Sequence, residues 1–235
     1  MIKKAMILAA GFGKRILPLT SKTPKPLLKI DNEETLLSNT IKFLIKFGIE
    51  EVIINAHHLS KKISDYINQG NFNINIKIVI EKEKILDTGG GVLNVIKYFS
   101  NEPFLIINPD TLWNSNYINE LELMQKFFFK DLKNKCSLLL VDKNRSFDKS
   151  FKGDFDLKNN LISRSGKNDL RYIYTGLQII KPEAFNDFDL KAFSINLVWD
   201  KLITLNEISG FESKNNFLHV SNFNIYKKLL ENIKH

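Results

Sequence analysis

The sequence predicts an α/β protein of three layers, in which helices cover both faces of a mostly parallel sheet. In the first part of the 235-residue chain, short apolar runs alternate with amphipathic segments and the connections are short, which is typical of this architecture. After about residue 142, strand-like runs follow one another with polar turns between them, which predicts a small antiparallel elaboration. Apolar residues make up 43% and charged residues 26%, as in ordinary globular proteins.

The first part of the chain supplies strands and helices in turn. Apolar residues from Leu36 to Ile45 recur at helical spacing, and Gly48 can end that helix. A glycine turn at residues 87–91 opens a later helix that runs through residue 99. The expected strands are residues 4–10, 51–55, 74–80, 104–108 and 136–141, and the other helices are residues 33–47, 59–67 and 117–129.

The second part of the chain adds three expected strands and two expected helices. The strands are residues 151–157, 161–163 and 172–180, and the helices are residues 195–206 and 222–233. The sequence contains no internal repeat, and no low-complexity linker separates the two parts. We therefore expect a single domain over residues 1–235, with a core at 1–142 and an elaboration at 143–235.

Charge and cysteine content narrow the range of partners. Lysine plus arginine is 34 against 26 acidic residues, a net charge of +8, but the lysines are interleaved with acids and form no long basic run. We expect a lysine-rich surface and phosphorylated small molecules as partners, with no nucleic acid and no membrane. The single Cys136 excludes an intramolecular disulfide and a zinc cluster of several thiolates. The short apolar N-terminus leads straight into a glycine loop, so we expect a cytoplasmic protein.

A glycine loop follows the first strand, where open α/β sheets bind ligands. Small residues let a ligand approach the backbone, and the amides freed by the turn can bond phosphate oxygens. A dinucleotide fingerprint would need glycine in place of Ile16, and a P-loop would need Ser or Thr in place of Arg15. The residues expected to line a nucleotide here are Leu8, Ala9, Ala10, Gly11 and Gly13.

This loop and the residues after it resemble the signature of sugar-1-phosphate nucleotidyltransferases. The matching residues are Leu8-Ala9-Ala10-Gly11-x-Gly13-x-Arg15-x-x-Pro18-x-Thr20-x-x-x-Pro24-Lys25-Pro26-Leu27. The resemblance implies a Rossmann-like three-layer α/β/α nucleotidyltransferase fold. It also implies an enzyme that moves a nucleoside monophosphate from a nucleoside triphosphate to a sugar 1-phosphate and releases pyrophosphate. Residues 1–142 would then bind the nucleotide and residues 143–235 the sugar phosphate.

Three residues are expected to carry the chemistry that the resemblance implies. Arg15 offers a fork for the β- and γ-phosphates, and Lys25, aimed by its flanking prolines, faces the α-phosphate. We expect Lys25 on an exposed loop, so that its replacement leaves folding nearly intact. Asp110 stands where this family has its magnesium-binding aspartate, which implies Mg²⁺ as cofactor, or it is a turn residue beside Pro109.

The resemblance also implies how the base and ribose are bound. A turn from Leu86 to Gly91 matches the family's base-reading turn, although the glycines alone would also fit a plain flexible turn. His57 and His58 point to opposite faces of an extended chain, so we expect pocket-edge or surface residues and not a metal site. The further residues assigned to the nucleotide are Asn55, Asp87, Thr88, Gly89 and Gly90.

The acceptor side resembles one branch of the family, the uridylyltransferases that act on N-acetylmuramic acid 1-phosphate in cell-wall recycling. This implies UTP as the donor. Mannose-1-phosphate guanylyltransferase, another NDP-sugar pyrophosphorylase, or a cytidylyltransferase for phosphocholine are alternatives, with a monomer or small homo-oligomer in each case. The residues assigned to the acceptor are Asp154, Tyr174, Thr175, Gly176, Asn196 and Trp199.

One segment departs from the family pattern of Trp-x-Asp-x-Gly-Thr-Pro, whose aspartate is a second magnesium ligand. Residues 217–223 stand there instead, with His219 in the aspartate's place. Imidazole is a poor ligand for magnesium. Either Asp110 and the phosphates hold the metal alone, or His219 binds a phosphate or sugar group, or it is only structural. The departure also leaves open a nucleotide-binding regulatory module with little catalysis.

Overall fold

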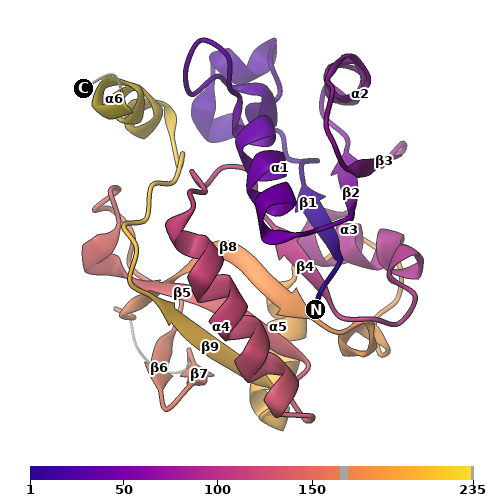
Figure 1. The fold of residues 1–235 in the computed structure, drawn as a ribbon, viewed down its shortest axis with the longest axis vertical. Helices are drawn as coiled ribbons and strands as arrows, with labels where there is room; N and C mark the ends of the chain where they lie inside the picture. The colour runs from indigo at the N-terminus through magenta and orange to yellow at the C-terminus, as the bar shows by residue number, and fades with distance from the viewer. Residues whose placement is uncertain (165–168, 234–235) are drawn as a thin grey trace.

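The computed structural model describes residues 1–164 and 169–233. In these residues, nine strands form one sheet in the order β3-β2-β1-β4-β8-β5-β9-β7-β6 (Figure 1). The strands are β1 (Lys4–Leu8), β2 (Glu51–Ala56), β3 (Asn75–Ile80), β4 (Phe104–Ile107), β5 (Cys136–Asp142), β6 (Asp156–Lys158), β7 (Leu161–Ser163), β8 (Tyr172–Ile180) and β9 (Ile208–Ser213).

Four of the eight strand pairs in the described residues are parallel, and these include every pair among β1, β2, β3 and β4. β1 pairs in parallel with β2 and β4, β2 with β3, and β5 with β9. β8 lies antiparallel between β4 and β5, and β6 and β7 add an antiparallel pair at one edge. The predicted fold class, mostly parallel with a small antiparallel part, is confirmed.

Helices cover both faces of the sheet. α1 (Leu36–Phe47), α2 (Ser60–Gln69) and α4 (Asn116–Lys130) pack on one face, and α3 (Asp87–Val95) and α5 (Asn196–Leu205) pack on the other. α6 (Phe223–Ile233) packs instead on the loops that follow β1, near one end of the molecule (Figure 1). Within the described ranges, no helix is long and apolar enough to cross a membrane.

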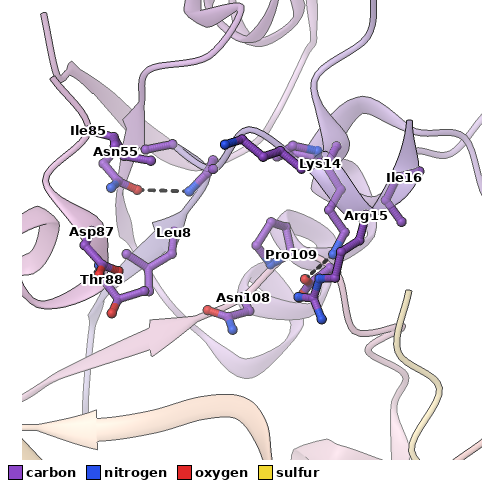
Figure 2. A pocket seen from close by; sticks show the side chains of 17 residues that line it. Leu8, Lys14, Arg15, Ile16, Asn55, Ile85, Asp87, Thr88, Asn108 and Pro109 are labelled. Carbon is purple, nitrogen blue, oxygen red and sulfur yellow. Dashed lines mark hydrogen bonds and ion pairs between the residues drawn. The ribbon is translucent and has the colours of Figure 1, made fainter. Parts of the chain in front are cut away.

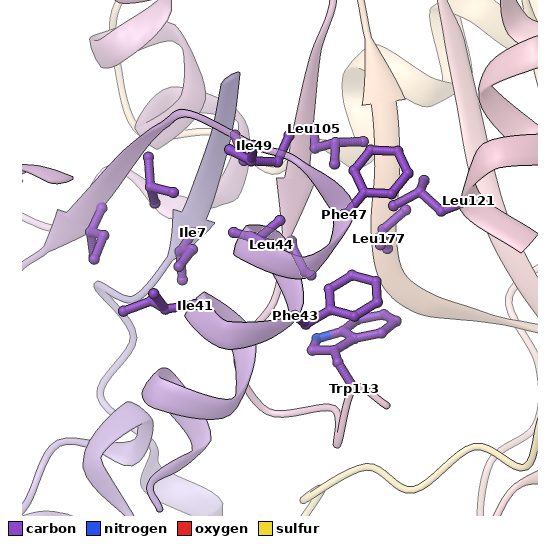
Figure 3. Packing of buried hydrophobic residues seen from close by; sticks show 14 of the residues in the cluster. Ile7, Ile41, Phe43, Leu44, Phe47, Ile49, Leu105, Trp113, Leu121 and Leu177 are labelled. Carbon is purple, nitrogen blue, oxygen red and sulfur yellow. The ribbon is translucent and has the colours of Figure 1, made fainter. Parts of the chain in front are cut away.

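The alternation of side chains along each strand explains the two cores. In β1, Ala5 and Ile7 face the helices α1, α2 and α4, whereas Met6 faces α3 and α5. Figure 3 shows the first of these cores, with Leu44 and Phe43 of α1 among the buried side chains and the Phe43 ring next to the Trp113 indole. Phe43 and Trp113 stack with centroids 5.5 Å apart.

Two strand predictions differ from the structure. β9 was not predicted, because Gly210 and Glu212 break the apolar pattern of a buried strand. Gly210 is required by packing, since a Cβ there would lie 2.6 Å from Ile162. The strand expected at residues 151–157 is reduced to β6, while β7 and β8 match their predicted ranges.

Candidate active site

A cavity of about 360 Å³ opens beside the C-terminal ends of β1 and β4 (Figure 2). Figure 2 shows Asn55 and Thr88 on one side of it and Arg15 on the other. The lining includes Leu8, Ala9, Ala10, Gly11, Gly13, Arg15, Lys25, Asn55, Asp87, Thr88 and Asp110, all predicted for the triphosphate site, together with Lys14, Ile16, Pro26, Ile85, Asn108 and Pro109.

The two glycines of the first loop have different structural roles. A Cβ on Gly11 would meet nothing within 4 Å, so the backbone there faces open space that a ligand can enter. Gly13 adopts a φ of 64°, and a Cβ on it would lie 2.8 Å from Thr20 and 3.2 Å from Lys25. The Thr20 hydroxyl donates to the Gly13 carbonyl at 2.9 Å, which fixes the turn. Gly11 therefore provides access, and Gly13 brings the following loop close.

Lys25 is held against Asp110. Its Nζ lies 2.5 Å from Asp110 Oδ2, and the two side chains are only 14% and 18% exposed. The expectation of an exposed lysine is therefore wrong. The segment Lys25–Leu27 forms a turn of 3₁₀ helix between Pro24 and Leu28, and this turn directs the lysine inward across the cavity.

Asp110 has one oxygen in the ion pair and one without a hydrogen bond. Oδ1 is buried, and His219 Nδ1 lies 3.6 Å from it. Burial alone would raise the pKa of Asp110, but His219 and Lys25 outweigh it and lower that pKa to about 2. Burial lowers the pKa of His219 itself, so its imidazole is neutral at neutral pH and Lys25 is the cation that faces Asp110 there.

His219 is brought to Asp110 by backbone pairing. Val220 N donates to Asp110 O at 2.8 Å, and Thr111 forms an isolated bridge with His219. The imidazole stacks on Phe217, with centroids 5.4 Å apart. The predicted counterpart of a second metal-binding aspartate thus lies beside the first, but it is enclosed by aromatic packing.

Asp148 anchors the segment that carries His219. The buried Asp148 carboxylate accepts hydrogen bonds from Ser150 N at 2.9 Å, from Ser150 Oγ at 2.7 Å and from Ser221 Oγ. Burial alone would raise the pKa of Asp148, but these hydrogen bonds outweigh it and lower the pKa. Ser221 lies two residues after His219, so this network fixes the end of the segment.

Arg15 is a cation of the cavity lining without a protein partner in the described residues. It is exposed, and within the described residues it takes part in no hydrogen bond or ion pair. Lys14, next to it, lies over the Phe12 ring at 5.5 Å. A guanidinium without a protein partner, beside an open backbone loop, is available to an incoming phosphate.

A buried carboxylate, which the sequence did not reveal, holds Asn55 of the cavity lining in place. Glu81 is 4% exposed and accepts hydrogen bonds from Asn55 Nδ2 at 2.7 Å and Leu86 N at 2.8 Å. Asn55 Oδ1 in turn accepts from Ala9 N at 2.9 Å. Glu81 therefore links the end of β3 to the glycine loop, although its run of alternating Glu and Lys resembles a surface segment.

Some residues of the glycine turn line the cavity, and others are buried in the protein interior. Asp87 and Thr88 line the cavity, whereas Gly89 and Gly90 are buried outside its lining. The amides of both glycines donate to Phe193 O, at 2.9 and 3.1 Å. A Cβ on Gly90 would lie 2.1 Å from Lys191 O, so these glycines allow α3 to pack closely against the 191–193 segment.

The residues assigned to the acceptor form a second group that lies outside this cavity lining. Tyr174 and Trp199 meet edge to face at 4.8 Å, and Asp154 accepts from Tyr174 N at 2.9 Å. Burial is the main cause of a raised pKa at Tyr174, and the negative charges of Asp110 and Asp154 add to it. Thr175 and Gly176 are buried in the sheet, where Gly176 O accepts from Asn108 N at 2.7 Å.

Asn196 is connected to this second group by Arg164, a residue that the sequence did not indicate. Arg164 donates to Asn196 Oδ1 at 2.8 Å and to Asp200 Oδ1 at 2.7 Å, and lies over the Phe155 ring at 5.4 Å. No motif marks Arg164 in the sequence, because its hydrogen-bond partners Asn196 and Asp200 are more than thirty residues away. Neither histidine is in the cavity lining: His57 Nδ1 lies 2.6 Å from Glu81 O, and His58 Nε2 lies 2.9 Å from Thr20 O.

A family model described as nucleotidyl transferase matches residues 4–146. The chain belongs to this family. The predicted resemblance is confirmed, and the protein is an enzyme of the sugar-1-phosphate nucleotidyltransferase type.

Relatives in this nucleotidyl transferase family differ in the substrates their names state. The chain is 25% identical over 223 residues, 93% of its length and 91% of the relative, to N-acetylmuramate alpha-1-phosphate uridylyltransferase of Caulobacter vibrioides. It is 30% identical over 190 residues, 80% of each chain, to D-glycero-alpha-D-manno-heptose 1-phosphate guanylyltransferase of Campylobacter jejuni. Among solved structures, HddC from Yersinia pseudotuberculosis has a TM-score of 0.77 at 24% identity over 99% of this chain and 100% of that one, which shows the shared Rossmann-like fold.

Proposed function

We propose that this nucleotidyltransferase transfers a uridylyl group from UTP to N-acetylmuramic acid 1-phosphate and releases pyrophosphate. The observation that carries the proposal is the convergence of Arg15, Lys25 and Asp110 on one cavity beside the open backbone at Gly11. The match with the Caulobacter uridylyltransferase, which spans nearly the whole of both chains, supports this choice of substrates. The product, UDP-N-acetylmuramic acid, would serve cell-wall recycling in the cytoplasm.

The reaction needs positioning and positive charge rather than a covalent intermediate. A phosphate oxygen of the sugar 1-phosphate forms a bond to the α-phosphorus, and the bond from that phosphorus to the bridging oxygen of the β-phosphate breaks. The electron pair leaves with pyrophosphate. Lys25 lies where its ammonium stabilises the negative charge on the α-phosphate oxygens, and Arg15 binds the β- and γ-phosphates.

The residues present fit a magnesium ion that is held mainly by the nucleotide. Asp110 Oδ1 is a buried carboxylate oxygen without a hydrogen bond, which suits a hard cation. The described ranges contain no cluster of three acidic, histidine or cysteine side chains that could hold a metal by itself. When bound, Mg²⁺ supplies positive charge to the phosphate oxygens, and Asp110 would be its ligand from this chain.

On the acceptor side, Asp154, Tyr174, Asn196 and Trp199 would bind the sugar. This group lies near β8, whose Gly176 O accepts from the cavity residue Asn108, so a sugar held there would present its phosphate toward the cavity. Asp154 and Asn196 offer hydrogen-bonding groups, and the buried Trp199 supports Tyr174 from the core. Arg164 would hold Asn196 in place.

A second candidate function is guanylyl transfer to a heptose or mannose 1-phosphate. The 30% identity to the Campylobacter guanylyltransferase over 80% of each chain favours it. Both candidates use the same triphosphate site and differ in the base and the sugar.

The deciding experiment crosses the four common nucleoside triphosphates with a panel of sugar 1-phosphates in the presence of Mg²⁺ and measures pyrophosphate release. We expect the fastest release with UTP and N-acetylmuramic acid 1-phosphate. Faster release with GTP and heptose or mannose 1-phosphate would replace the first proposal with the second. Triphosphate binding without pyrophosphate from any combination would indicate a regulatory module instead.

A further inference from the structure

One face of α4 carries large apolar side chains that nothing covers. Leu123 and Phe127 keep 48% and 52% of their surface exposed, and Leu132, just after the helix, keeps 84%. Figure 1 shows α4 lying along the sheet beside β9, and no described element crosses its outer side. The exposed residues of this face, which we call the α4 face, recur at helical spacing: Asn119, Glu122, Leu123, Lys126, Phe127 and Lys130.

The apolar part of the α4 face continues onto β9. Phe127 meets the half-buried Phe211 with centroids 6.0 Å apart. A groove of about 240 Å³ lies beside these two rings. Contiguous exposed apolar surface of this kind marks an interaction site rather than ordinary surface.

The charges on the α4 face are separated along the helix. Glu122 lies in the first half and Lys126 and Lys130 in the second, and within the described chain none of the three forms an ion pair. Glu120, the other acid of the first half, is already occupied: its oxygens accept from Ser213 Oγ and Lys214 N. An acidic half followed by a basic half is complementary to a second copy of itself in the opposite direction.

The helical repeat allows the apolar contacts and the charge pairs to form in the same antiparallel arrangement of two α4 helices. If a two-fold axis passes beside residue 125, Leu123 lies opposite Phe127 of the second copy, because the residue numbers of facing positions sum to 250. Glu122 then lies between Lys126 and Lys130 of that copy, displaced from each by about 3 Å along the axis, since the rise is about 1.5 Å per residue. The lysine and glutamate side chains are long enough to close that gap.

We propose that the α4 face is a homodimer interface, in which two copies of α4 pack antiparallel about a two-fold axis. Leu123 and Phe127 form its apolar centre, and Glu122 pairs with the lysines of the other copy on both sides. Such a contact is isologous, so it closes at two copies.

Sedimentation equilibrium over a range of protein concentrations tests the proposal. We expect the average mass to rise from 27.2 kDa toward twice that value. Phe127→Glu should raise the dissociation constant by about tenfold or more, because it removes a central aromatic anchor. Leu205→Glu is the matched control, since Leu205 is 50% exposed on α5, and it should leave the constant unchanged.

A charge swap tests the antiparallel arrangement itself. Glu122→Lys alone should weaken the dimer, because the new lysine faces Lys126 and Lys130 of the other copy. The triple variant that also carries Lys126→Glu and Lys130→Glu should restore it. A monomer at every concentration, a dimer indifferent to Phe127→Glu, or a triple variant no stronger than Glu122→Lys would each overturn the proposal. Circular dichroism checks that every variant is folded.

Discussion

Lys25 Nζ lies 2.5 Å from Asp110 Oδ2 and ties the turn after the glycine loop to the end of β4, 85 residues further on. The two side chains are mostly buried, so each would be an uncompensated charge without the other. The same pair aligns the ammonium that we assign to the α-phosphate. One contact therefore serves both the stability of the cavity and the proposed chemistry.

Lys25→Ala should lower both turnover and stability. Turnover falls by about 100-fold or more, because a charge aimed at the reacting phosphate is lost. The free energy of unfolding falls by roughly 2–3 kcal/mol, because Asp110 is left buried without its cation. Pyrophosphate release and urea unfolding measure the two effects.

The double variant Lys25→Ala with Asp110→Asn separates these effects. It should regain most of the lost stability, since no buried charge remains unpaired, while turnover stays low. A Lys25→Ala protein as stable as the parent would show that the ion pair contributes nothing to folding.

Arg15→Ala should reduce kcat/KM for the triphosphate by about 100-fold and leave the unfolding midpoint unchanged. Arg15 is exposed and has no hydrogen-bond or ion-pair partner in the described chain. Its replacement therefore removes contacts with the ligand and no contacts that stabilise the fold. Steady-state kinetics and thermal unfolding of the same preparation measure this. A clear drop in stability, or full activity, would contradict the role proposed for Arg15.

The two loop glycines should respond in opposite ways to alanine. Gly11→Ala meets nothing within 4 Å and should leave stability unchanged while weakening triphosphate binding, because the methyl group occupies space that the ligand needs. Gly13→Ala should cost about 1–2 kcal/mol of stability, because its φ is 64° and its Cβ would crowd Thr20. Calorimetric binding of UTP and urea unfolding compare the pair, and equal losses of stability would contradict this assignment.

Asp148→Asn should destabilise the protein by about 1–3 kcal/mol at pH 7, since the buried carboxylate accepts three hydrogen bonds. The pKa of Asp148 is lower in the folded state than its unfolded value of about 3.9. Its contribution is therefore fully present above that value and is lost as pH falls through the folded pKa. The stability difference between parent and variant should shrink below about pH 4 in urea unfolding.

Asp189→Asn provides the control for this pH dependence, because the Asp189 side chain is 93% exposed and should have little effect at either pH. A difference between parent and Asp148→Asn that is the same at pH 3 and pH 7 would contradict the role given to the Asp148 carboxylate.

The cavity beside Gly11 was accessible to sequence reasoning because many of its residues follow strand ends. Arg15 lies in the loop after β1 and Asp110 in the loop after β4, and these strands are neighbours in the sheet, so both loops meet at one edge. The small residues from Ala9 to Gly13 mark the loop after β1 as a place where a ligand can approach the backbone. Helix and strand positions in the alternating part of the chain were predictable from apolar periodicity.

Partners far apart in the sequence could not be predicted. Glu81 resembles a surface charge, and only its contacts with Asn55 and Leu86 show that it is buried. Arg164 is likewise defined by its contacts with α5. The burial of Lys25 depends on the carboxylate opposite it, which no local pattern reveals.

The position of β8 between β4 and β5 has a consequence for the nascent chain. Among the strands of the described residues, β5 pairs only with β8 and β9, both of which come after it in the sequence. Until residue 180 has left the ribosome, β5 has no partner and one edge of β4 stays open. Unpaired strand edges invite association with other chains, so this interval of translation is the step at which a chaperone would benefit this protein most.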